Sequence, residues 1–434
     1  MYSFILQEEI MLNLQDQILP ILHTHKIPGL DTGPSSIHPH YEGYSLVNLP
    51  SSVCKLFNIP GFGAPALHQN IISQLDQNYE HIVFLLADGL RFDFFREALT
   101  RQPWADFAAP GLLSPLTSIT PSTTSAALTT LWTGSHPSEH GILGYEVWLR
   151  EYGVIANMIL HSAFTFAGDI GGLKRAGFDP TTFLPVPTLG PHLKKHGVES
   201  YAIQHSAIAH SGLSKMLFPD VNILPYRSNA DLLVNLQQLL EQRKGQRTYA
   251  YVYWELIDSL SHLYGPDDVR NTLEFDLFSQ GLIQTLRTIQ KQSNGKTLFI
   301  LTADHGHIHT PILDHYDLTK RPEINQHLTM VPTGENRLPY LFPRTGHEDE
   351  LLSLINKVYG DDFLPIRSAD AIQQGLFGKG THHPMLADRL GDWILIPQND
   401  AYLWWWWQKE NPLLGRHGGL SPQEMLVPFF ALEL

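Results

Sequence analysis

Cysteine is almost absent from this sequence. Cys54 is the only one in 434 residues, so a disulfide within the chain is excluded. Chains with so little cysteine are typical of reducing compartments, where disulfides do not persist. We therefore expect a cytoplasmic protein.

Positive charge is also scarce. The chain has 29 Lys and Arg residues against 43 Asp and Glu residues, which gives a formal net charge of -14 at pH 7. Proteins that hold nucleic acid through many phosphate contacts need a basic face. Stable nucleic-acid binding is therefore not expected, and a bound phosphate group would be held mainly by metal ions.

Long apolar runs are missing too. No stretch is apolar for long enough to cross a bilayer. The N-terminal segment MYSFILQEEIMLNLQDQILP contains acidic residues and lacks the cationic flank of a secretory signal. We expect no membrane association. The apolar fraction of 43% and charged fraction of 17% are those of a folded globular chain, long enough for several domains or one large domain with an insertion.

Three short apolar runs end abruptly in polar residues: EHIVFLLADG, RTYAYVYWELID and KTLFILTADHG. Such runs predict strands that are buried on both faces of a parallel sheet. Helical patterns lie between and around them, including ADLLVNLQQLLEQRK and a long segment from about Asp268 to Gln292. The alternation predicts an α/β fold with a mostly parallel sheet flanked by helices.

Residues 308–385 interrupt this alternation with loops rich in proline and histidine, followed by helix-like segments. We interpret them as a smaller inserted α+β cap on a core formed by residues 76–307 and 386–434. Within the last of these ranges, DWILIP, AYLWWWW and MLVPFFAL are expected to return to the main sheet. Residues 1–75 are expected to form an N-terminal extension packed on the core.

An aspartate ends each of the three apolar runs: Asp88, Asp258 and Asp304. The carboxyl ends of parallel strands meet at one edge of the sheet, so the three carboxylates should converge there and need cations between them. His262 lies one helical turn after Asp258, and His305 directly follows Asp304. A mixture of Asp and His suits zinc or a similar first-row metal better than magnesium or calcium.

The segment TSITPSTTSAALTTLWTG contains the candidate nucleophiles. After Pro121 it enters an alanine-rich helix, so Ser122, Thr123, Thr124 and Ser125 all lie near a helix N-terminus, which favours an anion or an alkoxide. A hydroxyl bound there to a metal ion loses its proton more easily. Residue chemistry alone does not choose among the four.

Several separated motifs together resemble a known family. LADGLR, PSTTSAALTTLWTG with SHPSEHGI, ELIDSLSHLYGP, TADHG and RHGGLSPQEM occur in the order found in the alkaline phosphatase superfamily, in its type I phosphodiesterase/nucleotide pyrophosphatase branch. The resemblance covers the chain from about residue 80 to the end. It implies an alkaline phosphatase-like fold, two divalent ions, most simply zinc with manganese as an alternative, and a small phosphoester or nucleotide-like substrate.

The resemblance also implies a role for each matching residue. Pro121, Thr124 and the Thr133–Gly134 pair have the family spacing, which assigns the nucleophile to Thr124, with Thr123 as the alternative. The resemblance implies seven ligands, four for one ion and three for the other: Asp88, Thr124, Asp304 and His305, then Asp258, His262 and His417. It implies hydrolysis of phosphodiester or pyrophosphate bonds through a covalent phosphothreonine.

Some notable residues stay outside this predicted site. Ala127 stands where the resemblance implies an Asn that holds a phosphate oxygen, which questions nucleotide specificity. His307 and His309 alternate in HGHIH, which fits another metal site or, about as well, a polar loop leaving the metal centre, and we leave them out of the site. The tryptophans of AYLWWWW fit a nucleobase-stacking surface, but such residues more often fill a core or an interface. Tyr145 and Trp148 are weaker candidates for a substrate-pocket wall.

Two alternatives remain at this stage. A phosphomonoesterase or phosphomutase would use the same two-metal site, usually with a serine nucleophile. A metal-binding module of a larger system would keep the fold without turnover, but its site would be expected to have lost ligands, and all seven positions are occupied here.

Overall fold

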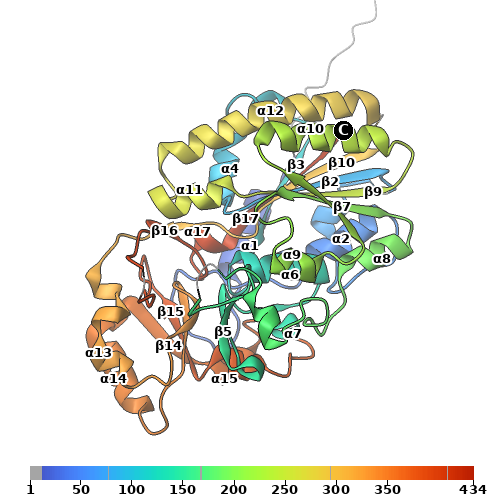
Figure 1. Cartoon of the computed structure of the whole chain (residues 1–434). Helices are drawn as coiled ribbons and strands as arrows, with labels where there is room; N and C mark the ends of the chain where they lie inside the picture. Colours follow the sequence, from blue (N-terminus) through green and yellow to red (C-terminus); the bar gives the residue numbers. More distant parts are fainter. Residues whose placement is uncertain (1–11, 77, 167–168, 294, 408) are drawn as a thin grey trace, which may run out of the picture.

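The computed structural model describes residues 12–434 except 77, 167–168, 294 and 408 (Figure 1). Residues 1–11, which begin the segment predicted not to be a secretory signal, lie outside the described residues. Among the helices of the described part, none has both the length and the apolar character that a membrane span requires.

The main sheet confirms the predicted fold class. Its strands in the described residues, in the order in which they pair, are β1 (Leu12–Asn13), β3 (Leu112–Thr117), β17 (Leu426–Glu433), β10 (Thr297–Thr302), β2 (His81–Ala87), β9 (Thr248–Trp254), β7 (Glu199–His205) and β8 (Val221–Tyr226). The three predicted apolar runs are β2, β9 and β10, which lie side by side and parallel. Strand β17 runs antiparallel to both of its neighbours.

Burial on both faces explains why these strands are apolar throughout. Every residue of β2, β9 and β10 is buried, because helices cover both sides of the sheet. Figure 1 shows α10 and α12 on one face and α2, α6 and α8 on the other. The main helices are α1 (Gln15–Thr24), α2 (Leu49–Leu56), α4 (Phe92–Ala98), α6 (Thr124–Thr133), α8 (Leu189–Lys195), α9 (Gly212–Leu217), α10 (Asn229–Gln242), α11 (Leu256–Tyr264), α12 (Val269–Ser293), α14 (Glu348–Tyr359) and α15 (Ser368–Gln374).

The remaining helices are short. They are α3 (Gln69–Ile72), α5 (Trp104–Phe107), α7 (Pro137–His140), α13 (Pro322–Asn325), α16 (Leu386–Leu390) and α17 (Pro422–Met425). A two-stranded ribbon, β11 (Ile308–His309) with β16 (Gly415–Arg416), joins the loop after β10 to the loop that carries His417. The ribbon brings these two loops together although they are far apart in the sequence.

A second, antiparallel sheet lies beside the main sheet (Figure 1). In pairing order its described strands are β14 (Phe363–Arg367), β15 (Trp393–Pro397), β13 (Leu338–Leu341), β12 (Thr333–Glu335), β4 (Glu146–Leu149), β5 (Val154–Asn157) and β6 (Ser162–Ala163). The prediction that DWILIP returns to the main sheet is wrong. This segment is β15, which pairs with β13 and β14, because an apolar run indicates burial in a sheet without indicating which sheet. MLVPFFAL does return to the main sheet, as β17.

The N-terminal segment packs on the core, in α1 and α2. Leu14, Ile18 and Leu22 are buried in the hydrophobic core that also contains the main sheet. Two hydrogen bonds of the buried His38 ring help to fix this segment: the backbone N–H of Ile27 donates to Nδ1 at 2.7 Å, and Nε2 lies 2.6 Å from the Thr32 hydroxyl. The predicted domain limits remain predictions. They are 1–75 for the N-terminal extension, 76–307 with 386–434 for the core, and 308–385 for the inserted cap.

Candidate active site

The carboxyl ends of β10, β2 and β9 meet at one edge of the main sheet, and the three predicted aspartates lie there. Asp88 directly follows β2, and Asp304 follows β10 after one residue. Asp258 lies in the first turn of α11, the helix that follows β9. The register of three adjacent parallel strands therefore brings together carboxylates that are far apart in the sequence.

A first group of side chains is deeply buried. It contains Asp88, Asp304 and His305, whose side chains are 0–2% exposed. The Nε2 atom of His305 lies 3.5 Å from Asp88 Oδ1 and 3.5 Å from Asp304 Oδ2. The Thr124 hydroxyl oxygen lies 3.2 Å from the same nitrogen. These four residues are the four that the sequence predicts to share one ion.

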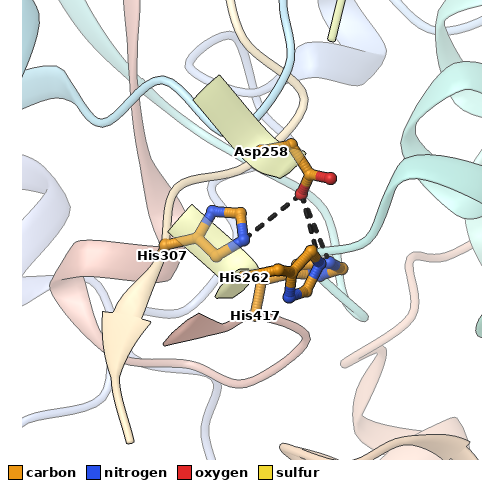
Figure 2. A group of neighbouring side chains, drawn as sticks. All are labelled: Asp258, His262, His307 and His417. Atoms are coloured by element: carbon orange, nitrogen blue, oxygen red, sulfur yellow. Dashed lines mark ion pairs between the residues drawn. The ribbon is translucent and has the colours of Figure 1, made fainter. Parts of the chain in front are cut away.

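A second group surrounds one oxygen of Asp258 (Figure 2). Asp258 Oδ1 lies 3.4 Å from His262 Nε2 and 3.8 Å from His417 Nε2. His307 Nε2 is closer still, at 3.2 Å. The structure thus brings together the three residues predicted for the other ion and adds His307.

The imidazole rings of both groups are oriented by the backbone. The Nδ1–H of His305 donates to the Gly306 carbonyl oxygen at 3.1 Å, that of His262 to Gly415 at 2.9 Å, and that of His417 to Ser122 at 3.1 Å. A ring whose Nδ1 carries the proton presents the lone pair of Nε2, which is how metal-binding histidines are commonly fixed. In all three residues it is Nε2 that faces the carboxylates.

The carboxylates themselves have unsatisfied oxygens. Within the described residues, Asp88 Oδ1, Asp258 Oδ1 and Asp304 Oδ2 are buried and receive no hydrogen bond. Buried carboxylate oxygens without partners are costly unless they coordinate a cation. The three atoms belong to the two groups in which Nε2 lone pairs also converge, so the donor set fits two divalent ions.

The charges of the two groups respond differently to their surroundings. Burial, together with the nearby carboxylates of Asp304 and Asp258, raises the pKa of Asp88 well above its usual value. Burial would also raise the pKa of Asp258, but the surrounding histidines, His262 first, lower it overall. In the absence of cations, repulsion between carboxylates is therefore stronger in the first group than in the second, where histidines surround Asp258.

The nucleophile candidates occupy different environments. The Ser122 hydroxyl donates to the Gly419 carbonyl oxygen at 2.8 Å, and the Ser125 hydroxyl donates to that of Gly144 at 2.8 Å. Thr123 has extended backbone and is the N-cap of α6, whereas Thr124 is its first helical residue. Of the four hydroxyls, only that of Thr124 contacts a predicted ligand within the described residues, since it lies against His305.

A family model described as type I phosphodiesterase / nucleotide pyrophosphatase matches residues 82–420. The chain belongs to this family. No curated protein matches the sequence. Among solved structures, murine ectonucleotide pyrophosphatase / phosphodiesterase 5 is 16% identical, with a TM-score of 0.59 and coverage of 81% of this chain and 87% of that one.

Two further solved structures show the same fold. An inactive variant of the murine protein in complex with AMP has 16% identity, a TM-score of 0.60 and the same coverage. Phosphonoacetate hydrolase from Sinorhizobium meliloti, in complex with phosphonoacetate, is also 16% identical, with a TM-score of 0.57 and coverage of 81% of this chain and 90% of that one. These likenesses show a shared fold, in agreement with the alkaline phosphatase-like fold that the resemblance of the motifs implied.

In this member of the type I phosphodiesterase family, the second group is the more accessible one. The side chains of Asp258 and His262 are 18% and 25% exposed, whereas those of Asp88, Asp304 and His305 are almost fully buried. A cavity of ≈ 150 Å³ adjoins the site and is lined by Thr124, Asp258 and Tyr253, among others. The site is therefore open on the side of Asp258.

The structure adds one residue to the predicted site. His307 belongs to the second group, although the sequence alone does not identify it, because a histidine in HGHIH fits a polar loop equally well. Its full burial is the decisive feature. Ala127 is fully buried in the hydrophobic core, and the inference about a missing phosphate-binding Asn at this position remains a prediction.

Proposed function

We propose that this family member is a metal-dependent hydrolase that cleaves phosphodiester or pyrophosphate bonds through a covalent intermediate on Thr124. The observation that carries the proposal is the contact between the Thr124 hydroxyl and His305 Nε2 at 3.2 Å. It places the hydroxyl among buried carboxylates that have unsatisfied oxygens. Cations held by these carboxylates would also coordinate the hydroxyl and make its proton easier to lose at neutral pH.

The two groups correspond to two ion sites. The residues that would hold the ions are Asp88, Thr124, Asp304 and His305 for one, and Asp258, His262 and His417 for the other. Nitrogen and oxygen ligands in this mixture favour zinc, with manganese as the alternative. When bound, such ions lower the pKa of a coordinated hydroxyl and stabilise the charge on attacking and leaving oxygens.

The residues of the chain orient the attack. The Thr124 oxygen forms a bond to phosphorus, and the bond from phosphorus to the leaving oxygen breaks, which yields phosphothreonine. Thr124 begins α6, whose first-turn N–H groups and dipole stabilise negative charge on the phosphoryl group. Water then cleaves the bond between phosphorus and the Thr124 oxygen and restores the hydroxyl.

Two other functions make different predictions. A phosphomonoesterase or phosphomutase would use the same ligands, and a catalytically silent module would bind metal without turnover. The family match favours the diester or pyrophosphate reaction. A small phosphoester or nucleotide-like molecule remains the proposed substrate, and the cytoplasm the proposed location.

A comparison of two synthetic substrates tests the proposal. Protein with about two metal ions per chain should hydrolyse bis-(4-nitrophenyl) phosphate faster than 4-nitrophenyl phosphate. Thr124→Ala should abolish this activity, by about 10⁴-fold or more in kcat, whereas Thr123→Ala, a change at the adjacent hydroxyl, should retain most of it. Faster turnover of the monoester would support the phosphomonoesterase, and fully metallated protein inactive on phosphodiesters, phosphomonoesters and pyrophosphates would support the module.

A further inference from the structure

A third cluster of possible metal ligands lies outside the two groups of the active site. It contains His327, His347 and Glu350 and is called here the α13–α14 cluster. His327 lies two residues after the end of α13, His347 is the N-cap of α14, and Glu350 lies in the first turn of α14. Figure 1 shows α13 and α14 side by side, away from the main sheet. The cluster therefore belongs to a different part of the fold from the active site.

Each of the three side chains brings one possible ligand atom close to the other two. His327 Nδ1 lies 2.9 Å from His347 Nδ1 and 3.4 Å from Glu350 Oε2, and His347 Nδ1 lies 3.9 Å from the same oxygen. Donor atoms around a tetrahedral zinc ion, with bonds of about 2.0–2.1 Å, lie about 3.3–3.4 Å apart. The distances in the cluster bracket this value, so they fit one ion held by two nitrogens and one oxygen.

The surroundings of the two imidazole rings fix their approach to each other. Arg344 connects the two residues through its backbone: its N–H donates to the His327 carbonyl oxygen at 2.8 Å, and its carbonyl oxygen accepts the His347 N–H at 2.9 Å. The His327 side chain is only 10% exposed, and the end of the Gln326 amide lies 3.3 Å from its Nε2. The oxygen of this amide can accept the Nε2–H, which leaves the Nδ1 lone pair for a metal ion.

The Glu350 carboxylate is available to a cation. In the described residues it forms ion pairs only with the two histidines. Glu348, in the same helical turn, is instead engaged by Arg367 at 3.1 Å and by the indole N–H of Trp393 at 2.7 Å. An acidic residue in a first turn also interacts favourably with the helix dipole. That interaction explains the position of Glu350, but it does not explain why two Nδ1 atoms face its carboxylate.

An ion at this place would connect two segments that share a small hydrophobic core. Ile324 and Leu328, close to His327 in the sequence, are buried in this core, and so is Leu351, one helical turn after His347. The core is separate from the large one that contains the main sheet. An unfolded chain would not hold the three ligands together, so metal binding would stabilise the folded state.

We propose that the α13–α14 cluster binds one zinc ion, or a similar first-row ion, that stabilises this part of the fold. Two imidazole nitrogens and one carboxylate oxygen, completed by water, are a ligand set that zinc accepts. The ligands are more exposed than those of the active site, so this ion should be bound more weakly and be lost on dialysis. Dialysed protein would then keep about two ions per chain, both in the active site. The inference does not depend on hydrolysis.

Titration of zinc chloride into dialysed wild-type protein tests the site directly. Calorimetry should show one further ion bound per chain, and the melting temperature should rise as the site fills. His347→Ala and Glu350→Gln each replace an exposed side chain and should fold. In both, the affinity for the further ion should fall about tenfold or more, and zinc should raise the melting temperature less than in the wild type. Both should keep the wild-type rate of hydrolysis.

His315→Ala is the matched control. His315 Nε2 lies 3.4 Å from Asp362 Oδ2, and its side chain is 40% exposed, compared with 43% for His347. In the described part of the chain, however, this pair has no third ligand beside it. His315→Ala should therefore bind the further ion as the wild type does.

Three results would overturn the proposal. If dialysed wild-type protein binds no further zinc, the contact between His327 and His347 is only a hydrogen bond between two rings. Equal affinity in the wild type and His347→Ala, or an equal loss in His315→Ala, would mean that zinc binds elsewhere on the surface. His417→Ala should still bind the further ion, which separates this site from the second ion site of the active centre. Binding of the further ion by a wild-type protein that hydrolyses no phosphoester would contradict only the proposed function.

Discussion

The imidazole rings of His305 and His417 are stacked, with 3.7 Å between their centroids and 19° between their planes. His305 belongs to the first group and His417 to the second, so the two predicted ion sites are adjacent and in contact through these two rings. His417 is provided by the loop that the β11–β16 ribbon holds against the loop after β10. The second site therefore depends on a contact between distant parts of the chain.

His417→Ala should remove one ion and leave the other. Asp258 and His262 would remain as the only ligands assigned to the second ion, whereas the first group would keep its full set. Elemental analysis after dialysis should fall from about two ions per chain to about one, with loss of hydrolysis. Retention of two ions, or loss of both together with the fold, would contradict separate sites.

His307→Leu should weaken metal binding in the second group. Burial lowers the pKa of His307 to about 4, so the ring is neutral near pH 7, and its Nε2 lies 3.2 Å from Asp258 Oδ1. Loss of a neighbour that orients a ligand typically reduces metal affinity about 10- to 100-fold. Competition with a chromogenic chelator measures this change.

His309→Ala is the matched control for His307. His309 comes from the same HGHIH sequence but is exposed, and its replacement should leave affinity unchanged. Equal affinities in the wild type and His307→Leu would show that burial of His307 is only a matter of packing.

The difference between these two histidines shows how far the sequence predicts the site. The seven predicted ligand residues come together because each follows a recognisable motif or strand end. His307 is fixed by the path of a loop, which no local pattern encodes. The same limit applies to β15, since its apolar run predicts a strand but its partners depend on how distant segments pack. Tertiary context decides such cases.

Glu424→Gln should destabilise both the fold and the second ion site. Glu424 and Arg337 form a buried pair, 2.8 Å between Oε2 and Nη2, with side chains 0% and 1% exposed. Glu424 also accepts the Gly419 N–H at 2.8 Å, which holds the loop of His417. Breaking a buried pair on one side costs about 3–5 kcal/mol, so thermal unfolding should occur several degrees lower.

The pair Arg150–Asp388 provides the control for Glu424. Its Arg side chain is 66% exposed, and an exposed pair contributes about 0–1 kcal/mol. Arg150→Ala should therefore leave the melting temperature almost unchanged. A melting temperature for Glu424→Gln within a degree of the wild type would show that the buried pair does not stabilise the fold.

His38 should make the protein sensitive to mild acid. Burial lowers its pKa from 6.5 to about 4, so between these values the unfolded chain binds a proton that the folded chain does not. Stability is therefore complete above pH 6.5 and falls as the pH drops toward 4, by about 2 kcal/mol at pH 5. The fall in melting temperature between pH 7 and pH 5 should be smaller in His38→Gln than in the wild type.

An equal fall in both proteins would show that His38 does not contribute. His309→Ala, which removes an exposed histidine, should behave as the wild type does.

The stereochemical course at phosphorus tests the central claim most directly. Two successive in-line displacements, one by the Thr124 oxygen and one by water, each invert the configuration. Hydrolysis of a chiral phosphorothioate diester in ¹⁸O-labelled water should therefore proceed with overall retention. Inversion would mean that water attacks the substrate directly, and it would contradict a covalent intermediate on Thr124.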